Sequence, residues 1–161
     1  MPTATRWPGV SAERPGEDAV PSFRPTYLRP GAWVAVGVGG AAGTLARYGT
    51  GLLGADALWP TVAVNLVGAF LLGVLLEVYA HHGPTPSGDR LRLLLGTGFL
   101  GGFTTYSTFA HQVTALIGGE VVVGLVYGVG LVLAGLAAAA AGVAVGGVLG
   151  RSRRGRRRGR G

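Results

Sequence analysis

Apolar residues in this chain are gathered into four long blocks that short polar connections separate. Each block holds roughly 20 or more residues with almost no charge, which is enough for a helix to cross a hydrocarbon layer about 30 Å thick. We place the blocks at residues 32–53, 58–79, 91–117 and 121–149. The pattern predicts an all-α membrane protein with four transmembrane helices, in a domain that spans residues 31–150.

The third block contains a segment that is poorly suited to a continuous helix. Gly101 and Gly102 each weaken a helix by about 1 kcal/mol relative to alanine, and the Thr and Ser hydroxyls that follow compete for backbone hydrogen bonds. Irregular backbone at membrane depth is tolerated only where protein covers it or where it lines a watery cavity. We therefore predict that the third helix is broken at residues 101–105 and that the break forms an ion or substrate site.

The two ends of the chain differ from the apolar blocks. Residues 1–30 are rich in proline and have no apolar period, so we expect a disordered cytoplasmic segment rather than a signal peptide. Residues 151–161 form an arginine-rich tail, for which contact with membrane lipid is a simpler interpretation than binding of nucleic acid. Cysteine is absent, which excludes disulfides and thiolate metal sites.

Charge is distributed unevenly along the chain. All 14 basic residues are arginines, and the formal net charge is +7. Outside the blocks, arginines occupy only the two ends and the second connection, whereas the other connections carry Asp56 and Glu120. With four spans, the ends and the second connection share one side of the membrane. The positive-inside rule thus predicts a multi-pass cell-membrane protein with both termini in the cytoplasm.

Polar side chains within the blocks need a reason, because they are costly at membrane depth. Thr61 and Asn65 share one helix face and offer hydrogens to an anion, although Asn65 would equally serve as a hydrogen bond between helices. Arg47 reaches an interface, pairs with a backbone carbonyl or gives a vestibule positive charge. Tyr106 and Phe109 share a face, where their ring edges favour an anion or simply pack.

The break also suits a small cation. Where a helix opens, backbone carbonyls lose their helical partners and bind hard cations such as sodium. One chain offers few such oxygens, so a full coordination shell requires two chains that meet at their breaks. Glycine pairs at a spacing of four further indicate close helix packing in a bundle or oligomer. These pairs are Gly39 and Gly43, Gly98 and Gly102, Gly124 and Gly128, and Gly142 and Gly146.

Three segments resemble the Fluc (CrcB) family of fluoride channels. They are residues 39–48 (GGAAGTLARY), 61–73 (TVAVNLVGAFLLG) and 98–109 (GFLGGFTTYSTF), in this order on the first three blocks. The resemblance covers residues 37–150 and implies an antiparallel dimer that lets fluoride leave the cytoplasm and so reduces its toxicity. It also implies a structural sodium ion (Na+) at the dimer interface, bound by the carbonyls of Gly101 and Thr104. The implied fluoride pathway consists of Thr61, Asn65, Tyr106, Phe109 and, near a vestibule, Arg47.

The chain departs from the family pattern at several pore positions. Tyr106 stands where phenylalanine is usual, and Ala110 and Gln112 replace a serine and a glutamate. In the last block, Tyr127 is followed one and two turns on by residues without hydroxyls. One polar track is therefore thinner than the resemblance implies.

The uneven charge bears on the partner of this chain. An antiparallel dimer needs two opposite orientations, and the arginines favour only one of them. We therefore expect a heterodimer with a homologous chain of opposite orientation rather than a homodimer.

Two other functions fit the sequence less well than a fluoride channel. A small-multidrug-resistance-like proton-coupled exporter needs a carboxylate in the first helix, where this chain has Arg47 and no acid. An accessory packing partner would explain the missing hydroxyls of the last block but not Thr61, Asn65 and Phe109. No nucleophile, base and orienting group occur together, so the sequence does not indicate an enzyme.

Overall fold

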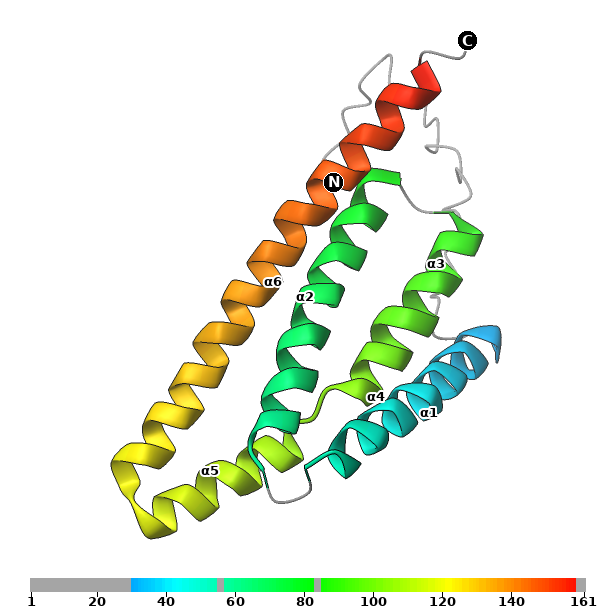
Figure 1. Ribbon diagram of the computed structural model, residues 1–161. Helices are drawn as coiled ribbons and strands as arrows, with labels where there is room; N and C mark the ends of the chain where they lie inside the picture. The colour runs from blue at the N-terminus through cyan, green and yellow to red at the C-terminus, as the bar shows by residue number, and fades with distance from the viewer. Residues whose placement is uncertain (1–29, 55–56, 83–84, 159–161) are drawn as a thin grey trace, which may run out of the picture.

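The computed structural model describes residues 30–54, 57–82 and 85–158, and these residues are almost entirely helical. Helices α3, η2 and α4 follow one another directly, and α5 follows them after residues 104–106; these four elements together are called the third run (Figure 1). The described chain thus forms four helical runs, which are α1, α2, the third run and α6. The all-α class predicted from the sequence is confirmed. The elements are α1 (Pro30–Leu52), α2 (Trp59–His82), α3 (Pro86–Arg92), the π-helix η2 (Leu93–Leu100), α4 (Gly101–Phe103), α5 (Ser107–Gly119) and α6 (Val121–Arg158).

Within the described residues, two helices are long and apolar enough to cross a membrane, namely α2 and the Val121–Arg151 part of α6. The third run does not meet this criterion because it is divided into shorter helices, of which α5 is the longest with 13 residues. Helix α6 also extends beyond residue 149, where the sequence placed its end. Arginine is a good helix former, and the helical backbone continues through Arg158.

The ends of the chain are described only in part. Residues 1–29 of the predicted N-terminal segment and residues 159–161 of the tail lie outside the described ranges. The first connection is likewise described without residues 55–56.

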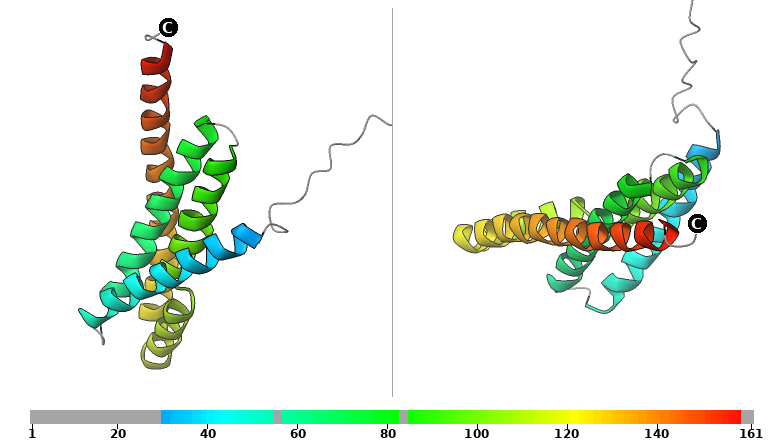
Figure 2. Two further views of the ribbon diagram at one scale, coloured as in Figure 1. Left: turned by 90° about the vertical axis from the view of Figure 1, so that its right-hand side faces the viewer. Right: turned by 90° about the horizontal axis from the view of Figure 1, so that it is seen from above.

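The helices pack in two main pairs rather than in chain order. Helix α2 lies beside α6, and α1 lies against η2 and α4, whereas α1 and α2 make few contacts with each other. Figure 2 shows α1 running obliquely across the third run. At the predicted break, the third run contacts α2 through a hydrogen bond between Thr105 and Asn65.

Glycines allow the helix pairs to approach closely, as their spacing predicted. A Cβ atom on Gly43 would collide with the carbonyl of Phe99, and one on Gly102 would collide with the carbonyl of Gly40. Gly142 meets the carbonyl of Phe70 in the same way. Backbone contacts backbone at these crossings, so a side chain larger than hydrogen has no room there.

Candidate functional site

The third run changes direction between α4 and α5. Helix α4 ends at Phe103, Thr104 has extended backbone with φ −74° and ψ 160°, and α5 begins at Ser107. Figure 1 shows this short link beside α2. Residues 104–106 therefore present backbone groups outside a helix in the middle of an otherwise apolar run.

Asn65 of α2 joins both backbone groups of Thr105. Its Nδ2 donates to the Thr105 carbonyl at 3.0 Å, and its Oδ1 accepts the Thr105 N–H at 2.9 Å. The amide thus pairs with one residue of the link as a neighbouring β-strand would. The sequence left two interpretations of Asn65 open, a donor to an anion and a hydrogen bond between helices, and the structure contains the second. One hydrogen of the Asn65 amide makes no hydrogen bond to Thr105.

Two carbonyls at the break, those of Gly101 and Thr104, lose their usual donors. In a continuous α-helix the N–H of Thr105 would donate to Gly101 and that of Thr108 to Thr104. Here the first donates to Asn65, and the second donates to the hydroxyl of Thr105 at 3.3 Å. No other donor within the described residues takes their place. The carbonyl oxygens of Gly101 and Thr104 are consequently available for an external partner.

Arg47 of α1 pairs with a third carbonyl at the break. Its Nε donates to the carbonyl of Gly102 at 3.1 Å, where a continuous helix would have used the N–H of Tyr106. The Nη groups of Arg47 remain free to face the cavity beside it. The sequence left three roles open for Arg47, and this contact matches the pairing with a backbone carbonyl.

A cavity of about 340 Å³ opens on one side of the link. Thr61 is only 4% exposed, and its hydroxyl has no hydrogen-bond partner in the part of the chain that the structure describes. It is therefore available as a donor to a small guest. The lining residues are Arg47, Tyr48, Gly51, Leu52, Gly54, Ala57, Pro60, Thr61, Val64, Thr105, Thr108 and Gln112.

A second cavity of about 290 Å³ lies on the other side of Thr105, which lines both. Tyr106 and Phe109 meet there with ring centroids 6.0 Å apart and planes tilted by 54°. Tyr106 is 79% exposed, so this cavity opens at the surface of the single chain. The lining residues are Asn65, Thr104, Thr105, Tyr106, Phe109, Leu131, Val132 and Gly135.

The sequence predicted no contacts for three polar residues of this site, namely Thr105, Thr108 and Gln112. The hydroxyl of Thr105 accepts the Thr108 N–H and Thr105 lines both cavities, while Thr108 lines the first one. Gln112 also lines that cavity, and its Oε1 accepts the Tyr127 hydroxyl at 2.7 Å. The run of Thr and Ser signalled a helix break, but their side-chain partners depend on how α2 and α6 pack.

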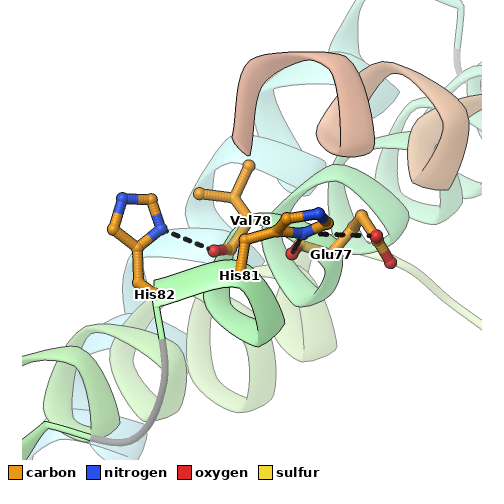
Figure 3. A network of polar contacts seen from close by, with 4 residues as sticks. All are labelled: Glu77, Val78, His81 and His82. Carbon is orange, nitrogen blue, oxygen red and sulfur yellow. Dashed lines mark hydrogen bonds and ion pairs between the residues drawn. The ribbon is translucent and has the colours of Figure 1, made fainter. Parts of the chain in front are cut away.

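A separate polar network lies at the C-terminal end of α2. The Nδ1 atom of His81 lies 2.9 Å from the Glu77 carbonyl and 3.3 Å from its carboxylate, while His82 turns to the Val78 carbonyl (Figure 3). Within the described ranges, no three side chains of the kinds that ligate metals gather into a group. This network lies outside both cavities at the break.

Apolar helices around a break that carries unpaired carbonyls define an all-α membrane protein with a polar site between its helices. Residues 34–143 match the family described as "CrcB-like protein, Camphor Resistance (CrcB)". The chain therefore belongs to this family, and the resemblance drawn from its three motifs is confirmed.

Individual relatives agree with the family match. The chain is 47% identical to "Fluoride-specific ion channel FluC" of Rhizobium leguminosarum bv. trifolii over 116 residues. The aligned region covers 68% of this chain and 91% of that protein. It is 45% identical over 136 residues to "Fluoride-specific ion channel FluC 2" of Leifsonia xyli subsp. xyli, covering 78% and 90%. For a "Fluoride-specific ion channel FluC" of Thermus thermophilus, the identity is 42% over 123 residues, covering 73% and 94%.

Proposed function

We propose that this protein is a fluoride-specific ion channel that exports fluoride from the cytoplasm and so reduces fluoride toxicity. The observation that carries this proposal is the chemistry of the two cavities at the break. Their linings combine an arginine, hydroxyls, amides and aromatic edges, and no carboxylate is among the described residues that line them. Such a surface favours a small anion. The names of the relatives support the same ion.

Each group has a distinct part in the proposed pathway. Arg47 draws the anion into the first cavity, where the free hydroxyl of Thr61 replaces part of its hydration shell. The remaining amide hydrogen of Asn65 and the ring edges of Tyr106 and Phe109 receive the ion on the other side of Thr105. Several weak donors in series release the ion more readily than one strong site would.

We further propose that Gly101 and Thr104 bind a structural sodium ion. Their unpaired carbonyl oxygens fit the preference of hard cations for oxygen ligands. When bound, the ion would supply positive charge at the break. Two oxygens do not make a full coordination shell for a hard cation, so the site is completed by a second chain.

A second chain would also cover the unpaired backbone carbonyls of the break. Lipid cannot hydrogen-bond to unpaired carbonyls, so non-helical backbone at membrane depth must be covered by protein. Gly101 and Tyr106 are exposed in the single chain, which makes the break the surface to be covered. An antiparallel dimer that meets break to break satisfies this requirement.

The charge distribution favours a heterodimer. The arginine distribution favours an orientation with both termini in the cytoplasm, and the same charges oppose the inverted orientation. A homologous chain with the opposite charge bias is therefore the preferred partner. The numbered name "FluC 2" of one relative is consistent with organisms that have more than one such chain.

The exporter alternative is less well supported. Proton-coupled export of a cation requires a carboxylate within the pathway, whereas Glu77 lies near the end of α2 and pairs with His81. The proposed activity is passive conduction, and the protein is not an enzyme.

Growth of a fluoride-sensitive bacterium that lacks its own channel tests the proposed function. Co-expression of this chain with its homologue should restore growth in fluoride, whereas a vector without insert should not. Sensitivity that is unchanged despite normal membrane expression would contradict fluoride export.

Removing the charge of Arg47 should slow conduction. Arg47→Gln is expected to lower fluoride flux by roughly tenfold, because a charge-assisted hydrogen bond and the positive vestibule are lost together. Arg47→Lys is the matched control, since it keeps the charge and should retain more flux. Equal flux from wild type and Arg47→Gln would remove Arg47 from the pathway.

Sodium should stabilise the assembled dimer. Because a ligand that binds only the folded state raises stability, the melting temperature in sodium chloride should exceed that in N-methylglucamine chloride at equal ionic strength. Fluorescence-detected size exclusion after heating provides the measurement. Identical melting temperatures in the two salts would argue against a sodium site.

A further inference from the structure

A third cavity, of about 320 Å³, lies between the end of α2 and the start of the third run. Leu75, the first α2 residue that lines it, follows Asn65 by roughly 15 Å along the helix. The cavity is therefore separate from the proposed ion pathway. Its lining consists of Leu75, Val78, Tyr79, His82, Thr85, Ser87, Gly88, Leu91 and Arg92.

This lining has an apolar part and a polar part. Leu75, Val78 and Leu91 offer aliphatic surface, while the side chains near the start of α3 are mainly polar. Helix α2 has 24 residues and is thus about 36 Å long, slightly more than the hydrocarbon thickness. Its last turn consequently lies at the level of the lipid headgroups, with the aliphatic part directed along the helix toward the membrane interior.

Arg92 is held in place without a carboxylate partner. Its guanidinium carbon lies 5.3 Å from the centroid of the Tyr79 ring, and the Tyr79 hydroxyl donates to Asp89. Among the described residues, the only salt bridge is the one between His81 and Glu77. Stacking on a ring leaves the guanidinium N–H groups free, so Arg92 presents fixed donors and a positive charge.

His82 adds a second polar group to the rim. Its Nδ1 lies 2.7 Å from the Val78 carbonyl, and because a carbonyl only accepts, this nitrogen carries the hydrogen. Figure 3 shows that His81 turns instead to Glu77. The Nε2 atom of His82 makes no hydrogen bond within the described residues, so it is a further polar atom at the rim.

We propose that this cavity binds an anionic phospholipid. The phosphate meets Arg92 at the rim, and one acyl chain lies over Leu75, Val78 and Leu91. Charge complementarity supports this occupant, because the described lining contains an arginine and no carboxylate. Basic pockets between membrane helices at the cytoplasmic side are suited to such headgroups. The proposal requires that the chain be embedded in a membrane and does not depend on fluoride conduction.

Native mass spectrometry of the full-length protein provides the test. Retention of phosphatidylglycerol should exceed that of phosphatidylcholine, and Arg92→Gln should weaken phosphatidylglycerol binding by about 5-fold. Arg90→Gln is the matched control, because it removes the same charge from the same helix at an exposed residue that does not line the cavity. It should leave binding near the wild-type value.

A second variant keeps the proposal testable if Arg92→Gln does not fold. Leu91→Trp fills the aliphatic part while retaining every charge, at a half-exposed position where the interface tolerates tryptophan. It should also weaken phosphatidylglycerol binding. Equal losses for Arg90→Gln and Arg92→Gln, unchanged binding in Leu91→Trp, or full competition by inorganic phosphate would overturn a lipid site.

Discussion

Replacing Asn65 by alanine is expected to abolish fluoride flux and to destabilise the protein. The change leaves both the N–H and the carbonyl of Thr105 without a partner. Each buried backbone group left in this way costs about 1–3 kcal/mol, so the link loses its attachment to α2. Fluoride efflux and the midpoint of thermal unfolding report the two effects separately.

Asn65→Asp is a second test of Asn65 that nearly preserves the size of the side chain. Aspartate still accepts from the Thr105 N–H but turns a carboxylate oxygen toward the Thr105 carbonyl, and it adds negative charge beside an anion pathway. Flux should again be lost. Thr114→Val is the control, since the Thr114 hydroxyl bonds its own helix on an exposed face. Wild-type flux in both Asn65 variants would show that Asn65 neither lines nor supports the pathway.

Replacing Gly43 by alanine should prevent correct packing of α1. The added methyl group would occupy the position of the Phe99 carbonyl, which is backbone and has no alternative rotamer. Because α1 and η2 make one of the two main helix contacts, the expected result is a loss of monodisperse protein in size exclusion. Fluoride flux should fall in proportion to the folded fraction.

Gly49→Ala is the matched control for this change. Gly49 lies on the same helix with nothing within 4 Å of the added carbon. Alanine is favoured over glycine in a helix by about 1 kcal/mol, so this variant should fold as well as wild type or better. Normal assembly of Gly43→Ala would contradict the close crossing of α1 and η2.

Helix type and close packing could be predicted from the sequence because they depend on local composition and spacing. Long apolar blocks predicted helices, and glycines at a spacing of four predicted the crossings. The exact end of α6 could not be predicted, because an arginine-rich segment is compatible with both coil and helix.

The pairing at the break depends on tertiary structure and could be predicted only in part. The residue type of Asn65 indicated a polar role, but its contact with Thr105 brings together positions 40 residues apart. Similarly, Tyr127 meets Gln112 only because α5 and α6 turn back on each other. The sequence identified these polar residues more readily than it identified their partners.

Fluoride efflux from liposomes, followed with a fluoride-selective electrode, tests the central claim most directly. We predict efflux of fluoride but not of chloride when this chain is reconstituted with its homologue, and little efflux from this chain alone. Strong fluoride efflux from the lone chain would contradict the heterodimer while supporting the channel. Absence of fluoride-selective efflux from both preparations, with folded protein in the liposomes, would contradict the channel itself.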